Sequence, residues 1–313
     1  MTAASETLVL VNPVSAGGQT MRRWPRIQAA LQGAGVDVHA RLTLGPGDAT
    51  EVAREEITRH GVRRVVAVGG DGTLNEVVNG CFDEHCAPLV PGICVGLIPS
   101  GTGSDLRRTL GLPTDPDAAA RLLARGTTRS IDLGRIEFGD GGHRLFVNVA
   151  DCGLGGEVVA RVNRRPEKRG GPVGSAVFLG VSVKELMTYH NREVLLTIDQ
   201  ETSRRRVQQV VIANGRCFGG GMRIAPDADP ADGLFDVVVV GDVSRSGALR
   251  AVPRLFRGTH LALRVVEVFR GRTVAIVPAD LLEPPRFDVD GEQVGRAPAE
   301  ISIMPGALRF AAP

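Results

Sequence analysis

The stretch from Val65 to Gly80 constrains the fold of this chain more than any other segment. Its first four residues are apolar and three of them are valines, a composition typical of a strand buried on both faces of a parallel sheet. The run Gly69-Gly70-Asp71-Gly72 follows directly, and beyond it apolar residues recur at helical spacing. The segment therefore predicts a buried strand, a glycine-rich turn and a helix in immediate succession.

The start of that helix is a candidate anion site. Thr73 and Glu76 have the spacing of a capping box, which predicts that the helix begins at Thr73. Glycines let the backbone come close to a ligand, while unpaired N–H groups and the helix dipole attract negative charge. A tight turn without a ligand is the ordinary alternative for an Asp-Gly pair. We favour a phosphate site because the strand, the glycines and the capping pair all agree.

Asp71 adds a chemical constraint to this site. A carboxylate beside phosphate oxygens is repelled unless a cation lies between them, so Asp71 implies Mg²⁺ bridged to a polyphosphate. The segment lacks the Gly-Lys-Ser/Thr ending of a P-loop, and Asn75 stands where a dinucleotide-binding fingerprint has its third glycine. Neither of these two common phosphate motifs accounts for the segment.

The first part of the chain alternates between short apolar runs and helical patterns. Leu8–Val11, Val36–Leu42 and Ile93–Ile98 are the other strand candidates, and each leads through a polar or glycine-rich loop into a helix. This alternation, up to about Arg125, predicts an open parallel sheet with helices on its faces. In such sheets ligands bind at the carboxyl edge, where these loops gather.

The pattern changes from Ser130 onward. Residues 131–138 alternate with period two, and many short β-rich runs separated by turns follow them. They predict an antiparallel β-sandwich, interrupted by helices near residues 174–189 and 246–256. We expect residues 1–133 to form the α/β domain and residues 134–313 the sandwich, with the C-terminal end able to return to the first domain.

Bulk properties restrict the class of protein. A chain of 313 residues suits two domains, and a formal net charge of +2 makes a strong global field and a nucleic-acid partner unexpected. No apolar run approaches the ~18 residues of a membrane-spanning helix. The apolar run at residues 8–11 is too short for a signal peptide.

A basic segment precedes the first helix of the second domain. It contains Arg161, Arg164, Arg165, Lys168 and Arg169. Beside an apolar helix, such a loop can meet an anionic membrane surface, each basic group adding up to ~1 kcal/mol. A solvated basic loop without a partner is the open alternative.

Five motifs resemble those of the diacylglycerol kinase catalytic-domain superfamily, which includes bacterial lipid kinases and the sphingosine and ceramide kinases. In chain order they are Asn12-Pro13-x-Ser15, Gly69-Gly70-Asp71-Gly72-Thr73, Gly101-Thr102-x-x-Asp105, Asp232-Gly233-Leu234 and Asp290-Gly291-Glu292. The resemblance covers almost the whole chain and implies a phosphofructokinase-like and NAD-kinase-like nucleotide domain. The chain departs from it at Gly17, where some relatives have lysine, and at Ser104, where asparagine is usual.

The resemblance implies a set of ATP contacts in the loops of the first domain. Arg22, in the first turn of a helix, is the basic residue expected to compensate for Gly17. The implied contacts are Asn12, Ser15, Gly17, Gly18, Arg22, Thr43, Gly69, Gly70, Asp71, Gly72, Thr73, Asn75, Gly101 and Thr102.

The resemblance also implies the catalytic and metal-binding residues. Glu292 is expected to be the base, because phosphorylating an alcohol requires the hydroxyl proton to leave. Asp71 and Asp105 are expected to order the Mg²⁺ and water around the phosphates, and Asp132 is expected to support the active-site network. The implied ligands of a structural Mg²⁺ are Asp229, Asp232 and the main-chain oxygen of Leu234.

The implied activity is that of a cytoplasmic lipid kinase that visits the inner face of the membrane. ATP with Mg²⁺ would lie across the glycine loops, and a lipid alcohol, diacylglycerol in the first place, would enter between the domains. Two alternatives stay open: a NAD-kinase-like enzyme of the same wider group, and a nucleotide- or lipid-binding regulator without catalysis. Both a monomer and a homodimer are compatible with the sequence.

Overall fold

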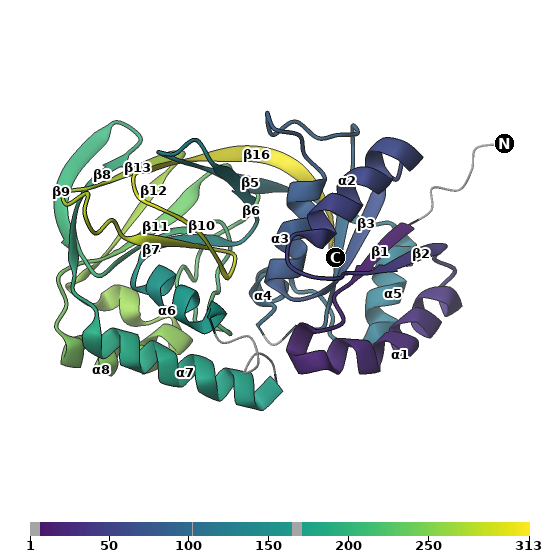
Figure 1. Cartoon of the computed structure of the whole chain (residues 1–313), viewed down its shortest axis with the longest axis horizontal. Helices are drawn as coiled ribbons and strands as arrows, with labels where there is room; N and C mark the ends of the chain where they lie inside the picture. The colour runs from purple at the N-terminus through teal and green to yellow at the C-terminus, as the bar shows by residue number, and fades with distance from the viewer. Residues whose placement is uncertain (1–6, 102, 165–170) are drawn as a thin grey trace. The chain divides into compact units, whose positions relative to one another are not determined.

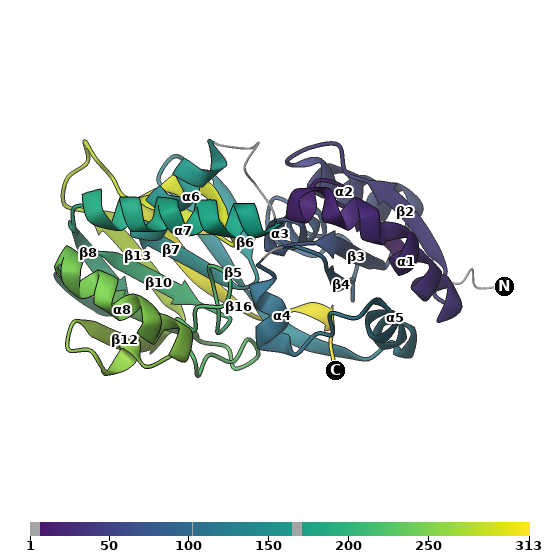
Figure 2. The same cartoon turned by 90° about the horizontal axis from the view of Figure 1, so that it is seen from below.

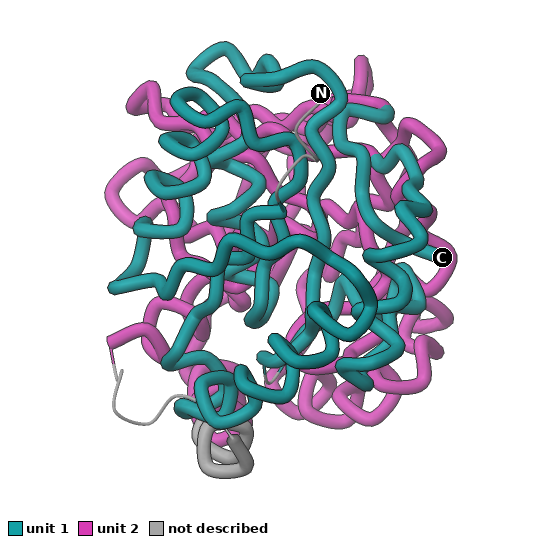
Figure 3. The backbone as a smooth tube through the Cα atoms, turned by 90° about the vertical axis from the view of Figure 1, so that its right-hand side faces the viewer, with its two compact units in different colours: residues 1–131, 306–313 teal, residues 132–305 magenta. Residues whose placement is uncertain are grey.

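The chain folds into two compact units. The computed structural model describes residues 7–101, 103–164 and 171–313 of the 313-residue chain, residues 171–177 by their backbone alone. Residues 1–131 and 306–313 make up unit 1, and residues 132–305 make up unit 2 (Figure 3). Two strands run from one unit into the other, β5 (Thr128–Phe138) and β16 (Ala299–Ala311).

Unit 1 contains a parallel sheet with the strand order β2-β1-β3-β4, and residues 309–310 of β16 pair in parallel with β4. Its strands are β1 (Thr7–Val11), β2 (Val38–Leu42), β3 (Arg64–Gly69) and β4 (Cys94–Pro99). Its helices are η1 (Ser15–Gly18), α1 (Gln19–Gly33), α2 (Asp48–His60), α3 (Asp71–Gly80), α4 (Asp105–Leu110) and α5 (Pro116–Arg125). The chain passes from β1 to β2 on one side and returns to β3 on the other, so a topological switch point lies between β1 and β3.

The strands of unit 1 are apolar on both faces because helices cover both. Val9, Val11 and Val66 share one core with the buried side chains of α1 and α5. On the other face Leu8 and Leu10 are fully buried, and helices α2 and α3, which contact each other, cover this face (Figure 1). The open parallel α/β sheet predicted from the sequence is confirmed.

Unit 2 is an antiparallel β-sandwich, as predicted. One sheet has the order β12-β11-β10-β7-β14-β15 with antiparallel pairings, and the other contains β16, β13, β8 and β9 together with β5 and β6. The strands are β6 (His143–Phe146), β7 (Val149–Gly153), β8 (Arg192–Ile198), β9 (Glu201–Val207), β10 (Gln209–Ala213), β11 (Phe235–Val240), β12 (Val266–Gly271), β13 (Thr273–Pro278), β14 (Arg286–Val289) and β15 (Glu292–Arg296). Side chains from both sheets, Phe146, Phe235 and Phe287 among them, share one buried core.

The helices that accompany the sandwich are α6 (Leu154–Asn163), α7 (Gly171–Thr188), α8 (Arg245–Arg257) and the short η3 (His260–Ala262). The helices predicted near 174–189 and 246–256 correspond to α7 and α8. Helix α6 was not predicted, because Gly155 and Gly156 in its first turn lower helix propensity. A Cβ on Gly156 would lie 2.3 Å from the carbonyl oxygen of Arg286, so the packing of α6 on β14 requires glycine there.

Candidate active site

The parallel strands of unit 1 end level with one another. In the sheet register Val11 lies opposite both Leu42 and Val68, and Val68 lies opposite Ile98. The loops that follow these strands therefore open at the same edge of the sheet. The carboxyl ends of β1 and β3 flank the switch point, which is where open α/β sheets bind their ligands.

The loops after β3 and β4 touch at two glycines. A Cβ on Gly101 would lie 2.4 Å from the Cα of Gly70, a distance that no side chain could tolerate. Ser100 and Gly101 both donate N–H bonds of 2.9 Å to the carbonyl of Gly69. The close approach requires glycine at position 101 and joins the two loops directly ahead of α3 and α4.

Asp71 is the first residue of α3, and its side chain caps α4. Its Oδ2 accepts the N–H of Asp105 at 2.7 Å, and its Oδ1 accepts the N–H of Leu106 at 3.3 Å. A carboxylate in this position satisfies N–H groups that a helix N-terminus leaves unpaired and interacts favourably with the helix dipole. Asp71 therefore orients α4 against the glycine loop.

Asp105 is only 4% exposed and forms an ion pair with Arg108, whose Nη1 lies 2.7 Å from its Oδ1. A Cβ on Gly103 would lie 3.5 Å from Oδ2 of Asp71 and 3.8 Å from Oδ2 of Asp105. Both acids thus present an oxygen to the space that the missing side chain of Gly103 leaves. Carboxylate oxygens that converge on such a space are a donor set that suits Mg²⁺.

Side-chain hydrogen bonds join the loops at the switch point. Nδ2 of Asn12 donates to Oγ1 of Thr73 at 3.0 Å, which links the loop after β1 to α3. The hydroxyl of Thr20, in the first turn of α1, donates to Oγ of Ser100 at 2.8 Å. The loops after β1, β3 and β4 are therefore held together by contacts within the protein.

The remaining predicted ATP contacts have different surroundings. Ser15, Gly17 and Gly18 form η1, Gly72 lies in the first turn of α3, Arg22 is exposed on α1, and Thr43 is buried just after β2. Asn75 is fully buried, and its Oδ1 accepts a bond of 3.1 Å from Asn79, so this side chain supports α3 from within the fold. Thr102 lies outside the described residues.

The capping box predicted for α3 is wrong. The helix begins at Asp71, two residues before Thr73. The carboxylate of Glu76 instead accepts N–H bonds from Gly47 at 2.9 Å and Ala49 at 3.2 Å, at the start of α2. The spacing of Thr73 and Glu76 does not distinguish a capping box from the observed arrangement. Only the packing of α2 on α3 brings the N–H groups of Gly47 and Ala49 within reach of Glu76.

In unit 2 the Asp-Gly-Glu motif forms the turn between β14 and β15. Asp290 and Gly291 have φ values of 51° and 90°, typical of a type I′ hairpin, and Glu292 opens β15 opposite Val289. The Asp290 carboxylate accepts three backbone N–H bonds from residues 147–149, at 2.9, 3.0 and 2.9 Å. These bonds anchor the hairpin and hold Glu292 half-buried beside its turn.

Asp132 belongs to the same polar network. Nδ2 of Asn214 donates to the carbonyl of Asp132 at 2.9 Å and to the carbonyl of Val147 at 2.7 Å. Oδ2 of Asp132, a residue only 1% exposed, accepts the N–H of Gly233 at 2.8 Å. Asp132 thus supports the turn at 229–234 and, through Asn214, the segment on which the hairpin is anchored.

Two further carboxyls lie next to this hairpin. Asp151 on β7 and Asp288 on β14 are direct partners in the sheet register. Burial raises the pKa of Asp151 to about 7, while the Gly156 N–H and the Gln209 side chain act in the opposite direction. Burial raises the pKa of Asp288 well above its ordinary value, and the charge of Asp151 adds to this effect. The two carboxyls therefore resist being ionised together.

Comparison with known proteins places the chain in a family. Residues 6–136 match the diacylglycerol kinase catalytic domain, and residues 153–312 match the YegS C-terminal NAD kinase beta sandwich-like domain. A diacylglycerol kinase of Mycobacterium tuberculosis is 33% identical over 310 residues, which cover 97% of this chain and 94% of that protein. The chain belongs to the diacylglycerol kinase and YegS lipid kinase family. This confirms the resemblance seen in the five motifs, and membership of a kinase family implies the use of ATP.

Other members of the kinase family cover the chain equally well. A probable YegS-like lipid kinase of Stenotrophomonas maltophilia is 30% identical over 310 residues, 97% of this chain and 95% of that protein. A crystal structure of a putative diacylglycerol kinase from Bacillus anthracis has the same fold, with a TM-score of 0.76 and 23% identity. That comparison covers 100% of this chain and 99% of the other.

The carboxylates of the predicted structural Mg²⁺ site have partners within the protein, and the site itself stays a prediction. Oδ1 of Asp232 accepts the N–H of Leu234 at 3.0 Å, and its Oδ2 pairs with the guanidinium of Arg270. Oδ1 of Asp229 accepts the N–H of Ala231 at 3.2 Å. Over residues 7–101, 103–164 and 171–313, no group of three or more His, Cys, Asp or Glu side chains is arranged to hold a metal ion. Arg270 therefore supplies the positive charge next to Asp232, and an ion there would have to displace it.

Several residues of the site gave no signal in the sequence. Asp290 belongs to an Asp-Gly turn pair, so its three long-range N–H bonds could not be foreseen. Asn214, Asp151 and Arg270 stand in segments that indicate a strand or a turn and nothing more. Their roles depend on distant neighbours: Asn214 bonds residues 82 and 67 positions away, and Arg270 pairs with Asp232, 38 positions away. Asp151 meets Asp288 only as a register partner in another strand.

The predicted membrane-facing basic segment is only partly described. Arg161 forms an ion pair with Glu185 of α7, with 2.7 Å between Nε and Oε1, and Arg164 is exposed. Arg165, Lys168 and Arg169 lie outside the described residues. None of the helices in the described part of the chain combines the length and apolar character needed to span a bilayer.

Proposed function

We propose that this member of the family is an ATP-dependent lipid kinase that phosphorylates the hydroxyl of a membrane lipid alcohol, with diacylglycerol as the favoured substrate. The observation that carries the proposal is the edge of the unit 1 sheet, where the glycine loops after β3 and β4 meet beside the switch point and Asp71 and Asp105 face one space. Relatives named diacylglycerol kinase support the choice of acceptor.

The residues of unit 1 have defined tasks in this proposal. The N–H groups of the loop Gly69–Gly72 bind the phosphates of ATP, and the convergent carboxylates of Asp71 and Asp105 order the Mg²⁺ that ATP brings with it. Arg108 neutralises Asp105 and limits the repulsion between that carboxylate and the phosphates. Charge neutralisation and positioning are the main sources of rate in phosphoryl transfer.

Glu292 is the proposed base. The hydroxyl oxygen of the lipid forms a bond to the γ-phosphorus, the bond between that phosphorus and the β,γ-bridging oxygen breaks, and ADP leaves with the electron pair. The carboxylate of Glu292 takes the hydroxyl proton. The anchoring of Asp290 to residues 147–149 keeps this carboxylate from drifting with a flexible turn.

The test is a kinase assay with labelled ATP, Mg²⁺ and a panel of lipid alcohols in mixed micelles, with NAD⁺ as a further acceptor. We expect label in phosphatidic acid and a loss of at least a hundredfold in kcat for Glu292→Gln. Glu201→Gln, a matched change on an exposed strand of unit 2, should leave kcat unchanged. Label in NADP⁺ instead of a lipid would overturn the proposed substrate class. ATP binding without any turnover would favour the alternative of a nucleotide- or lipid-binding regulator without catalysis.

A further inference from the structure

Helix α8 presents a surface that the proposed reaction does not use. It carries Arg245, Arg250, Arg254 and Arg257 and contains no acidic residue. In the same helix the side chain of Leu249 is 44% exposed and that of Phe256 is 50% exposed. Large apolar side chains this exposed, set among cations, mark an interaction surface.

The exposed residues of α8 form two adjacent rows. Leu249, Pro253 and Phe256 follow one another at intervals of four and three residues, and Arg250, Arg254 and Arg257 do the same one position further on. Each row therefore runs along one side of the helix. The buried side faces the sandwich, where Ala248 is 8% exposed and Leu255 packs on a core cluster.

Within the described part of the chain, no carboxylate balances the charge of this row. Arg245 Nη2 lies 3.5 Å from the ring of His190, and Arg250 Nε donates to the carbonyl of Ser246 at 3.1 Å, so neither of these partners is acidic. Among the described residues no carboxylate forms an ion pair with an arginine of α8.

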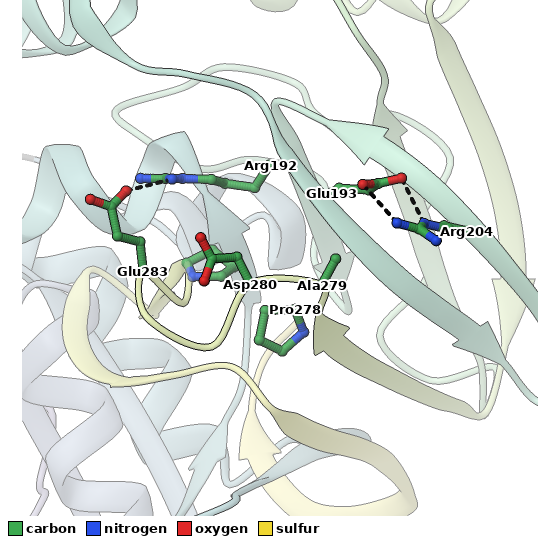
Figure 4. A pocket seen from close by; sticks show the side chains of 8 residues that line it. Arg192, Glu193, Arg204, Pro278, Ala279, Asp280 and Glu283 are labelled. Atoms are coloured by element: carbon green, nitrogen blue, oxygen red, sulfur yellow. Dashed lines mark hydrogen bonds and ion pairs between the residues drawn. The ribbon is translucent and has the colours of Figure 1, made fainter.

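Several arginines elsewhere in unit 2 pair with carboxylates. In a hollow of about 220 Å³, Arg192 lies 2.7 Å from Glu283 and Arg204 lies 2.6 Å from Glu193 (Figure 4). That hollow has no excess of positive charge to offer an anion. Unlike Arg192 and Arg204, the arginines of α8 have no carboxylate partner among the described residues.

Helix α7 carries further exposed apolar side chains. It contacts α8, and both helices lie on the same face of unit 2 (Figures 1 and 2). Leu179, Val183 and Met187 of α7 are 57%, 37% and 45% exposed. Because they are four residues apart, they share one side of that helix. Exposed apolar side chains thus occur along two neighbouring helices.

We propose that α8, together with the exposed side of α7, docks unit 2 on the surface of an anionic lipid bilayer. A helix with a basic row beside an apolar row suits the bilayer interface, where cations meet lipid phosphates and apolar side chains enter the acyl boundary. A nucleic acid or an acidic protein would match the arginines but leave Leu249 and Phe256 without a complement. The inference rests on the proposed function, because the substrate of a lipid kinase stays in the membrane.

The test is co-sedimentation of the full chain with vesicles of phosphatidylcholine containing phosphatidylglycerol. Arg250→Glu combined with Arg254→Glu should reduce the partition coefficient at least tenfold, since each basic residue near an anionic surface contributes about fivefold. The matched control is Arg121→Glu combined with Arg125→Glu on α5, which has the same spacing, the same change in charge and exposed arginines. This control should partition like the unaltered protein.

A second variant reports the apolar row directly. The chain has a single tryptophan, Trp24, which is buried in unit 1. In Phe256→Trp the added indole should shift its emission to shorter wavelength when phosphatidylglycerol vesicles are added, and not with phosphatidylcholine alone. An emission that stays unchanged while the protein is bound would overturn the role of this row.

The outcomes separate this inference from the proposed function. Equal loss of vesicle binding in the α5 control, full binding by the α8 variant, or tighter binding to double-stranded DNA than to the vesicles would each overturn the docking role of α8. Kinase activity on short-chain diacylglycerol in neutral micelles is measured separately. Its absence in the unaltered protein would reject the proposed function, while the vesicle results would still decide the role of α8.

Discussion

Asp151 and Asp288 are carboxyls inside a β-sheet whose ionisation opposes folding. Burial raises the pKa of Asp151 from 3.8 to about 7. Between these two values the folded chain keeps a proton that the unfolded chain has released, so the free energy of unfolding falls as the pH rises through this window. Above about pH 7 the contribution of Asp151 is lost and the curve levels off, and Asp288 acts with the same sign.

We therefore expect Asp151→Asn to flatten the pH dependence of stability. In the unaltered protein the free energy of unfolding should fall by an amount on the order of a few kcal/mol between about pH 5 and pH 8. Asparagine cannot ionise, so this fall should be absent from the variant. Urea unfolding of both proteins across this range measures the effect, with Asp37→Asn on an exposed loop as the control. Parallel curves for Asp151→Asn and the unaltered protein would show that Asp151 does not retain its proton in the fold.

Arg270 decides whether the turn at 229–234 depends on a divalent ion. Its guanidinium pairs with Asp232, and its Nε lies 3.9 Å from Oδ2 of Asp236. Arg270→Met leaves these carboxylates to repel each other, so we expect a lower Tm that excess Mg²⁺ partly restores. The unaltered protein should have the same Tm with EDTA and with Mg²⁺. The control variant Arg272→Met, which changes an exposed arginine two residues further on, should also have the same Tm in both. A fall in the Tm of the unaltered protein in EDTA would mean that the ion binds and Arg270 moves away.

At the scale of elements, the contact between α2 and α3 sets the position of the glycine loop after β3. The two helices approach at Gly80, where a Cβ would lie 2.6 Å from the carbonyl oxygen of Thr50 and 2.7 Å from the Cβ of Ala53. Glu76, one turn earlier on α3, accepts N–H bonds at the start of α2. Any change that separates the helices also moves the residues that follow β3.

Gly80→Ala should destabilise the protein although alanine is the better helix former. The propensity gain of about 1 kcal/mol is outweighed by overpacking, which typically costs 1–3 kcal/mol. Gly33→Ala is the matched control, because Gly33 lies in the last turn of α1 and a Cβ there would meet no atom within 4 Å. Chemical unfolding should show opposite signs for the two variants. A stabilised Gly80→Ala would mean that α2 and α3 are further apart than described.

Element type was largely predictable from the sequence, because the signals are local. The buried runs of unit 1 and the period-two runs of unit 2 are visible without tertiary information. Strand β9 gives no strand signal in the sequence, since Arg204, Arg205 and Arg206 hide its alternation, and it is held as a strand by pairing with β8. Residues of the candidate site were predictable only where a motif lies next to a visible structural signal, such as the glycines that directly follow the buried strand β3. The partners of Glu76 and Asp290 are set by packing, so no spacing could reveal them.

At the scale of the whole molecule, the last residues of the chain complete unit 1. Leu308, Phe310 and Ala312 are fully buried, and Arg309 and Phe310 pair in parallel with Cys94 and Val95 of β4. Unit 2 is a continuous segment, residues 132–305, whereas unit 1 needs residues 306–313 as well as 1–131. The sequence-based boundary at residue 133 remains a prediction about independently folding domains.

A chain that ends at residue 305 should therefore lose the fold of unit 1 and keep that of unit 2. Trp24, 8% exposed and the chain's single tryptophan, makes fluorescence a specific probe of unit 1, while circular dichroism reports both units. Phe310→Ala tests the same contact with a single substitution. It should lower the free energy of unfolding, followed by Trp24 fluorescence, by about 3–5 kcal/mol, the usual cost of removing a buried phenyl group. Arg309→Ala, an exposed neighbour, should change it little. If the truncated chain kept the emission and melting curve of the full chain at Trp24, β4 would not depend on β16, and unit 1 would be complete at residue 131.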